Sequence, residues 1–254
     1  MSATIVPKFN QRRGLLAAVF MVTAALAFAG VAPAARSAEA PTKIGIIGTG
    51  KIGSSLARYW ARAGYEVFVS SRHPEELASL VAGLGPKAHA GTPAQAAAFG
   101  QVVVVSIPYA SMPQLGQELG SALEDKVIID TSNPIERRDG AMALDAQKAG
   151  AGVTTARLLH NTHVVRAFNC IPAALLASES NRQPARTAIP IGGDDAAAVR
   201  VVQKLVSDAG FDAVVVGSLA QTRLFDLQQP LATGKLTAAE YRAMMQQLHL
   251  PAGS

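Results

Sequence analysis

Short apolar runs alternate with amphipathic segments along the chain from Pro41 onward. The apolar runs are typical of buried strands, and the segments between them have the 3.6-residue spacing of helices. Strands are predicted at residues 43–47, 66–70, 87–90, 102–107, 126–130, 163–168, 186–191 and 213–216. Helices are predicted at residues 53–63, 74–82, 93–99, 111–123, 154–159, 196–209, 218–227 and 237–248. This alternation predicts βαβ units and one open, mainly parallel α/β sheet.

Two stretches depart from this alternation. Residues 135–151 form a polar, glycine-bearing connection with room for one short helix. Near the end of the chain, Thr237 and Glu240 have capping-box spacing, which predicts that a terminal helix begins there. We therefore expect one α/β domain at residues 41–230, followed by a short helical C-terminal extension at residues 231–254 that serves packing or association.

Residues 1–40 have the composition of an export signal. Lys8, Arg12 and Arg13 precede an uncharged run at residues 14–31, and small residues follow. The adjacent arginines favour a twin-arginine signal, which exports folded proteins, over general secretion. We expect a periplasmic or otherwise exported protein; the alternative is an inner-membrane anchor, because the uncharged run is close to the length that spans a bilayer.

The charge balance and the cysteine count exclude several classes of protein. The net charge of the chain is +5, but four of its 23 basic residues precede Glu39, the first acidic residue. The rest carries 19 basic and 18 acidic residues, so no nucleic-acid partner is expected. Cys170 is the only cysteine, which excludes a disulfide scaffold and a cysteine-based zinc site.

A glycine motif directly follows the first predicted strand and opens the first predicted helix. Its residues are Gly48, Thr49, Gly50, Lys51, Ile52 and Gly53. In such a GxGxxG motif the first glycine permits a tight turn, the second lets a pyrophosphate approach, and the third lets helix and strand pack closely. The sequence therefore predicts a Rossmann-like, doubly wound fold that binds a dinucleotide on these six residues.

The end of the second predicted strand bears on the choice of dinucleotide. Sites for NAD place a carboxylate there, whereas this chain has Ser71, Arg72 and His73 with no carboxylate before Glu75. Charge-assisted hydrogen bonds to a 2′-phosphate contribute about 1.5–3 kcal/mol each. This corresponds to roughly a tenfold to hundredfold preference for NADP(H).

Further candidates follow the fourth and fifth predicted strands, where ligands of such sheets bind. They are Ser106, Ile107 and Pro108 on one strand end and Asn133 on the next. We expect these residues to line the nicotinamide half of the cofactor; the alternative is ordinary strand-end turns. Asp130 is a candidate base, but a strand-end aspartate more often caps the following turn.

Five segments, in order, resemble the NADP oxidoreductases that depend on coenzyme F-420. They are KIGIIGTGKIGSSLARYWARAGYEVFVSSR, VVVVSIP, VVRAFNCIP, IPIGGDD and GSLAQTRLFDL, within residues 42–230. The resemblance implies that Thr49, Ser71 and Arg72 contact NADP and that Ile107 and Pro108 lie near the nicotinamide. It also implies that residues 167–172 border the pocket of a second ring system, either coenzyme F-420 (a deazaflavin) or a flavin.

The resemblance implies direct hydride transfer, which depends on proximity more than on a protein acid or base. No catalytic residue is therefore assigned. We expect an NADPH-dependent oxidoreductase with a small-molecule redox acceptor, and twin-arginine export would carry it from the cytosol with its cofactor. Two alternatives are a reductase of small imine or carbonyl compounds and a non-catalytic NADPH-binding module that serves a membrane redox partner. A homodimer is left open.

No metal site is expected from the histidines. His160 and His163 lie three residues apart, with no carboxylate near them in the sequence. We expect both to be structural or exposed, and Cys170 to be a small buried apolar residue.

Overall fold

The computed structural model describes residues 1–3 and 42–250 of the 254-residue chain. The export-signal prediction therefore falls almost wholly outside the described residues. Within the described part, no helix combines the length and the apolar character needed to cross a membrane. Residues 42–250 belong to one folded unit.

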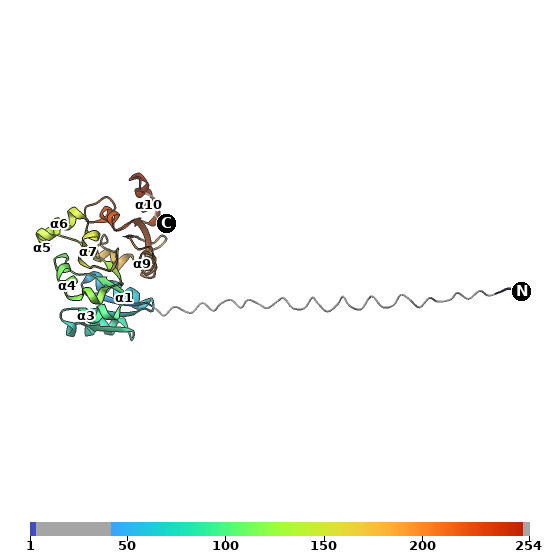
Figure 1. Ribbon diagram of the computed structural model, residues 1–254, viewed down its shortest axis with the longest axis horizontal. Helices are drawn as coiled ribbons and strands as arrows, with labels where there is room; N and C mark the ends of the chain where they lie inside the picture. The colour runs from blue at the N-terminus through green and yellow to red at the C-terminus, as the bar shows by residue number, and fades with distance from the viewer. Residues whose placement is uncertain (4–41, 251–254) are drawn as a thin grey trace. The chain divides into compact units, whose positions relative to one another are not determined.

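An eight-stranded sheet runs through this unit in the order β3-β2-β1-β4-β5-β6-β7-β8 (Figure 1). The strands are β1 Lys43–Ile47, β2 Glu66–Ser70, β3 Ala88–Gly91, β4 Val102–Val105, β5 Val127–Asp130, β6 His163–Arg166, β7 Ala188–Gly193 and β8 Asp212–Gly217. Every neighbouring pair is parallel except β6 and β7, which are antiparallel. Strands β2 and β3 extend the sheet on one side of β1, and the strands from β4 onward extend it on the other side. This reversal of strand order confirms the predicted doubly wound, mainly parallel α/β fold.

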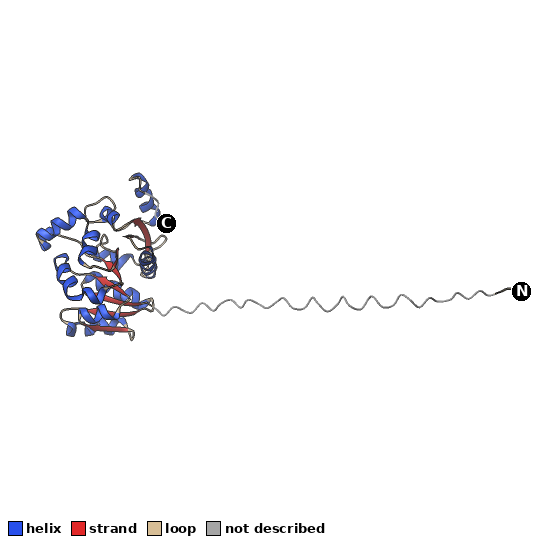
Figure 2. Ribbon diagram, in the orientation of Figure 1, coloured by secondary structure: helices blue, strands red, loops and turns tan. Residues whose placement is uncertain are grey.

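Helices cover both faces of the sheet (Figure 2). They are α1 Lys51–Arg62, α2 Ala78–Leu84, α3 Pro93–Phe99, α4 Met112–Leu123, α5 Glu136–Asp139, α6 Ala141–Ala149, α7 Ala151–Leu158, α8 Ala173–Glu179, α9 Ala196–Asp208 and α10 Ala238–Gln247. Three 3₁₀ turns accompany them, namely η1 Pro74–Leu77, η2 Tyr109–Ser111 and η3 Ala220–Phe225.

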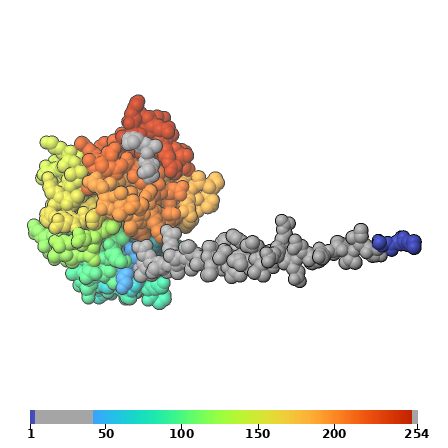
Figure 3. All heavy atoms as spheres, turned by 45° about the vertical axis from the view of Figure 1, so that its right-hand side comes forward, coloured from blue at the N-terminus to red at the C-terminus, as the bar shows by residue number. Residues whose placement is uncertain are grey.

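The unbroken apolar sequence of β4 reflects burial on both faces of the sheet. Val102 and Val104 join the core beneath α1, α8 and α9, whereas Val103 and Val105 join the core beneath α3, α4 and α7. All four side chains are at most 1% exposed. Sheet order follows chain order from β4 to β8, so in the space-filling view the colours run across the unit from green to red (Figure 3).

The structure corrects the prediction at residues 135–151. Two helices, α5 and α6, occupy most of this region in place of a connection with one short helix, and α7, the helix predicted at residues 154–159, begins three residues early at Ala151. Gly140 and Gly150 lie between them with φ of +62° and +97°, a conformation that glycine adopts at no steric cost. The glycines that made the segment look like a loop are the junctions between its helices.

Other boundaries also differ from prediction. Helix α8 was not expected, because Leu176 is its only fully buried side chain and gives little periodicity. Residues 218–227 hold the 3₁₀ turn η3 in place of an α-helix. Strand β4 ends at Val105, two residues earlier than expected, because η2 begins soon afterwards at Tyr109.

The predicted terminal helix is present as α10. The Thr237 hydroxyl accepts a hydrogen bond from the Glu240 amide at 3.3 Å, and Glu240 Oε2 accepts one from the Thr237 amide at 2.7 Å, which confirms the capping box. Tyr241 and Met245 of α10 are buried in a cluster with Val214 of β8. This extension therefore packs against the β7–β8 end of the sheet.

Candidate functional site

The three glycines of the GxGxxG motif differ in the space that surrounds each of them. A Cβ atom at Gly48, where φ is +97°, would lie 2.3 Å from the Ser106 carbonyl oxygen, and one at Gly53 would lie 2.0 Å from the Gly48 carbonyl oxygen. A Cβ at Gly50 would meet no atom within 4 Å. Gly48 and Gly53 are thus required by the packing of the loop, whereas the space beside Gly50 is open and can admit a ligand.

This loop opens onto a pocket of about 570 Å³. Gly50 is the N-cap of α1, and no side chain among the described residues caps this helix. The first amides of a helix have no intrahelical acceptor, and they carry a partial positive charge. An uncapped N-terminus beside an open glycine suits a pyrophosphate, so the residues present fit a dinucleotide.

The end of β2 forms one side of the pocket. Ser71 and Arg72 both line it, and the Ser71 hydroxyl accepts a hydrogen bond from the His73 amide at 3.1 Å. Arg72 is exposed and forms no ion pair with any residue in the described ranges. Its guanidinium is available for an anion, although the carboxylate of Glu76 lines the same pocket.

Helix α4 supplies a wall that was not predicted. Leu115 and Leu119 line the pocket together with Gln114 and Glu118. Gln114 donates a hydrogen bond to Glu118 at 2.7 Å, which fixes the polar rim of this wall. The sequence showed only an amphipathic helix here, and the spacing of Leu115 and Leu119 could have signalled a common face.

The pocket brings together eight of the thirteen predicted cofactor-binding residues. They are Gly48, Thr49, Gly50, Ser71, Arg72, Ser106, Ile107 and Pro108. The other five do not line it, and they are Lys51, Ile52, Gly53, His73 and Asn133.

The structure gives four of these five another environment. Gly53 packs against the loop, Ile52 packs against the core, and His73 Nδ1 lies 3.5 Å from Glu75 Oε1. Asn133 donates its side-chain amide to the Asn169 carbonyl oxygen at 2.6 Å. Cofactor binding by these residues stays a prediction.

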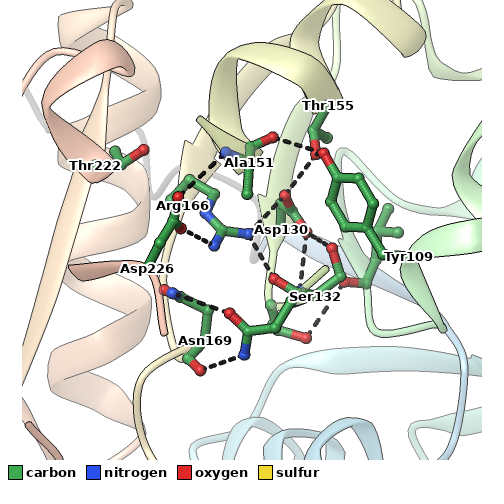
Figure 4. A network of polar contacts seen from close by, with 12 residues as sticks. Tyr109, Asp130, Ser132, Ala151, Thr155, Arg166, Asn169, Thr222 and Asp226 are labelled. Atoms are coloured by element: carbon green, nitrogen blue, oxygen red, sulfur yellow. Dashed lines mark hydrogen bonds and ion pairs between the residues drawn. The ribbon is translucent and has the colours of Figure 1, made fainter. Parts of the chain in front are cut away.

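A buried ion-pair network lies behind the ends of β5 and β6. Arg166 lies between Asp226 and Asp130 (Figure 4). Its Nη1 is 2.9 Å from Asp130 Oδ2 and its Nη2 is 2.5 Å from Asp226 Oδ1; Nη1 also donates to the Ser132 carbonyl oxygen at 2.6 Å. Burial alone would lower the pKa of Arg166, but attraction to both carboxylates outweighs it and raises that pKa above its ordinary value.

The remaining oxygens of Asp130 show what this carboxylate does. Its Oδ1 accepts hydrogen bonds from the Ser132 amide at 2.9 Å and from the Ser132 hydroxyl at 2.5 Å, and its Oδ2 accepts one from the Thr155 hydroxyl at 2.8 Å. Asp130 is 0% exposed. The expectation that it caps the turn is confirmed, and a carboxylate so enclosed is poorly placed to act as a base.

Tyr109 joins this network from η2. Its hydroxyl donates to the Ala151 carbonyl oxygen at 2.8 Å and lies 3.2 Å from the Thr155 hydroxyl. Burial, aided by the charge of Asp130, raises the pKa of Tyr109 to about 12. The sequence indicates this network only through two charged residues that have apolar neighbours on both sides, Arg166 and Asp226.

A second pocket, of about 400 Å³, lies beyond the end of β5. It is lined by the segment after β5, by α5 and α6, and by η3 and the residues that follow it, namely Pro134, Ile135, Glu136, Arg137, Gln147, Arg223, Asp226, Leu227, Gln228 and Gln229. Residues 167–172, expected to border the pocket of a second ring, line neither of these two pockets. Residues 167–171 are buried.

No group of three or more potential metal ligands occurs among residues 1–3 and 42–250. His163 Nδ1 lies 3.2 Å from Asp195 Oδ2. The fold therefore brings a carboxylate from a distant segment to this histidine, but the two residues make a pair and not a group of three ligands. Cys170 is buried, as expected, and burial raises the pKa of its thiol to about 12. This thiol is therefore protonated at neutral pH.

Comparison with known proteins identifies relatives of this chain. The model of the family "NADP oxidoreductase coenzyme F420-dependent" matches residues 43–134. The F420-dependent NADP reductase of Methanothermobacter thermautotrophicus is 31% identical over 203 residues, which cover 74% of this chain and 87% of the archaeal protein. The metalloreductase STEAP3 of Rattus norvegicus is 32% identical over 191 residues, which cover 73% of this chain but only 36% of the rat protein.

A solved structure extends the likeness to the fold. The hypothetical protein SMa0349 of Sinorhizobium meliloti is 27% identical, with a TM-score of 0.67, and the match covers 78% of this chain and 95% of that one. The glycine loop, the pocket at its mouth and these relatives lead to one conclusion. The chain belongs to the family of coenzyme F420-dependent NADP oxidoreductases, which has a Rossmann-like fold.

Proposed function

We propose that the protein transfers hydride between NADP(H) and a flavin-like or deazaflavin acceptor, such as coenzyme F-420, after export from the cytosol. The observation that carries the cofactor half of this proposal is the pocket of about 570 Å³ that joins the open Gly50 loop to Arg72. The acceptor half is supported by the named activity of the archaeal relative.

The residues of the first pocket divide the binding of NADP(H) between them. The amides at the start of α1 would hold the pyrophosphate, and Ser71 and Arg72 would hold the 2′-phosphate. Ile107 and Pro108, which follow β4, would border the path to the nicotinamide. When bound, the reduced cofactor supplies a hydride, so the protein has to orient the two rings and exclude water rather than move a proton.

Two alternative functions are not favoured. The curated relatives are named as an NADP reductase and a metalloreductase. Neither name supports a non-catalytic NADPH-binding module or a reductase of small imines. The buried carboxylate of Asp130 also gives no accessible acid for protonating such a substrate.

The cofactor proposal is tested by replacing Arg72 with alanine. A lost charge-assisted contact to the 2′-phosphate should weaken NADPH binding about tenfold or more and leave NADH binding nearly unchanged. Glu76→Gln should strengthen NADPH binding, because it removes a negative charge from the same pocket. Arg58→Ala, an exposed change on α1 outside the pocket, is the control for surface charge. Calorimetry that gave equal losses for both nucleotides with Arg72→Ala would contradict this role.

Export is tested separately. We propose that residues 1–40 direct the folded protein through the twin-arginine route, because Arg12 and Arg13 precede an uncharged run. Replacing both arginines with lysine should retain the protein in the cytosol, as measured by cell fractionation and immunoblotting. Equal periplasmic amounts of the two forms would argue for general secretion, and a membrane-bound product would argue for an uncleaved anchor.

A further inference from the structure

The lining of the first pocket includes an apolar part that a phosphate does not need. It is formed by side chains of η1, α3 and α4, namely Leu77, Pro93, Leu115 and Leu119. The three leucines are at most 8% exposed, so each presents only part of its surface to the pocket. Planar, weakly polar rings bind between apolar side chains of this kind. We call these four residues the apolar slot.

Strand order places the α4 side of this slot across the glycine loop from Arg72. Strands β2 and β4 both pair with β1, on opposite sides, so they lie two strand spacings, or about 10 Å, apart. Arg72 follows β2, whereas α4 follows β4. In NADP(H) the 2′-phosphate and the adenine are carried by the same ribose. A cofactor with its 2′-phosphate on Arg72 would therefore place its adenine between these strand ends, against the apolar slot.

The rim of the slot on α4 holds one amide in a fixed orientation. Gln114 and Glu118 line the pocket, and Gln114 Nε2 donates a hydrogen bond to Glu118 Oε1 at 2.7 Å. An ionised carboxylate can only accept, so the amide nitrogen of Gln114, and not its oxygen, has to face Glu118. Within the described ranges neither side chain has another hydrogen bond. Gln114 thus keeps two unused groups, the acceptor Oε1 and the second hydrogen of Nε2.

An acceptor and a donor side by side match one edge of adenine. The 6-amino group of adenine is a donor and the ring nitrogen beside it is an acceptor, so a glutamine amide can recognise adenine through two hydrogen bonds. Hypoxanthine has a carbonyl oxygen in place of the amino group. This oxygen would meet Gln114 Oε1, and the amide cannot turn over because Oε1 would then face the carboxylate of Glu118. An acceptor held against another acceptor weakens binding.

We propose that Gln114, held in place by Glu118, recognises the 6-amino group of the adenine in NADP(H). This inference rests on the proposed binding of NADP(H) and adds a preference for one purine. Gln114 would contact the base and determine specificity, whereas Glu118 is a positioning residue that acts through Gln114. The apolar slot would contact the ring itself, and so contributes to affinity for any purine.

The test uses two dinucleotides that differ only at this position of the purine. NADP⁺ and nicotinamide hypoxanthine dinucleotide phosphate are titrated calorimetrically into the purified protein. The wild type should bind NADP⁺ more tightly by about tenfold or more. Gln114→Leu should weaken NADP⁺ binding about tenfold without weakening binding of the hypoxanthine form. Glu118→Leu frees the amide to turn, so the ratio of the two affinities should fall below about threefold.

A neighbouring glutamine supplies the matched control. Gln117 is exposed on α4 but does not line the pocket, so Gln117→Leu should keep the wild-type ratio. Removing the charge of Glu118 affects both dinucleotides alike, because they carry the same phosphates. The ratio of the two affinities, and not either affinity alone, is therefore the quantity to compare.

Four outcomes count against the inference or its basis. Equal affinity of the wild type for the two dinucleotides would overturn base recognition and leave NADP(H) binding intact. Equal losses for both dinucleotides with Gln114→Leu would assign this residue to the shape of the pocket. A ratio that both variants leave unchanged would mean that another group recognises the base. Binding of neither dinucleotide by the wild type would refute the proposed function itself, so the two failures are distinguishable.

Discussion

Replacing Arg166 with methionine should be among the most destabilising changes in this protein. The change keeps an unbranched side chain in the core but removes the cation between Asp130 and Asp226. Arg166 and Asp130 are both 0% exposed, so water cannot replace the lost partner. Two buried carboxylates would then share one region without a compensating charge.

The expected loss of unfolding free energy depends on the hydrogen-bond donors that each carboxylate retains. Asp130 retains its donors from Ser132 and Thr155, and Asp226 retains the Ala151 amide. Removing one partner of a buried ion pair costs about 3–5 kcal/mol, and two carboxylates are affected, so we expect about 5 kcal/mol or more.

The single change Asp226→Asn is the matched comparison. It leaves Arg166 paired with Asp130, so one charge-assisted bond is weakened and no charge is orphaned. The expected loss is about 1.5–3 kcal/mol. Arg166→Met should therefore be clearly worse than Asp226→Asn, although both changes touch the same contact.

Urea unfolding at pH 7, followed by far-ultraviolet circular dichroism, measures both free energies. Where Arg166→Met yields no folded protein, the triple variant that adds Asp130→Asn and Asp226→Asn should recover a cooperative transition, because it removes both orphaned charges. A loss below about 2 kcal/mol for Arg166→Met, a larger loss for Asp226→Asn, or no recovery in the triple variant would refute the electrostatic reasoning.

Three further outcomes are expected. Gly53→Ala should lower the unfolding free energy, because its Cβ would lie 2.0 Å from the Gly48 carbonyl oxygen. Gly50→Ala should leave the unfolding free energy unchanged but weaken NADPH binding, because the space beside Gly50 is open. The reverse pattern in urea unfolding and calorimetry would be inconsistent with this loop geometry. The pKa of Tyr109 is about 12 in the folded protein, above its ordinary value of 10.0. The contribution of its neutral hydroxyl to the free energy of unfolding is therefore complete below pH 10 and is lost as the pH rises to 12. Urea unfolding measured between pH 10 and 12 tests this. In Tyr109→Phe the fall of the unfolding free energy over this range should be about 2–3 kcal/mol smaller than in the wild type, and an unchanged fall would contradict the assignment. Cys170 should react slowly with a thiol reagent in the native protein and rapidly in urea, and fast native labelling would show that its burial is transient.

The sequence was sufficient for features that depend on neighbouring residues. Strand β1, the glycine loop and helix α1 are adjacent, so the spacing of Gly48, Gly50 and Gly53 predicts their geometry directly. The alternation of apolar and polar positions likewise predicted all eight strands with small errors at their ends. The α10 capping box is predictable for the same reason, since Thr237 and Glu240 are three residues apart.

Features that depend on distant residues were not accessible in this way. Arg166 is 36 residues from Asp130 and 60 residues from Asp226, and only the strand order brings them together. The wall supplied by α4 depends on how that helix rests on the sheet, which a single sequence does not fix. At residues 135–151, glycines at helix junctions and glycines in loops have the same sequence pattern, so conformation alone separates them.

The only tryptophan in the chain gives the protein a built-in optical reporter. Trp60 on α1 is 0% exposed, donates its indole N–H to the Leu205 carbonyl oxygen at 2.9 Å, and contacts Phe168 edge to face. Its emission should therefore be blue-shifted in the native state and should move to longer wavelength only when the interface between α1, α9 and the end of β6 separates. Excitation at the indole band would follow the opening of that interface without any attached dye.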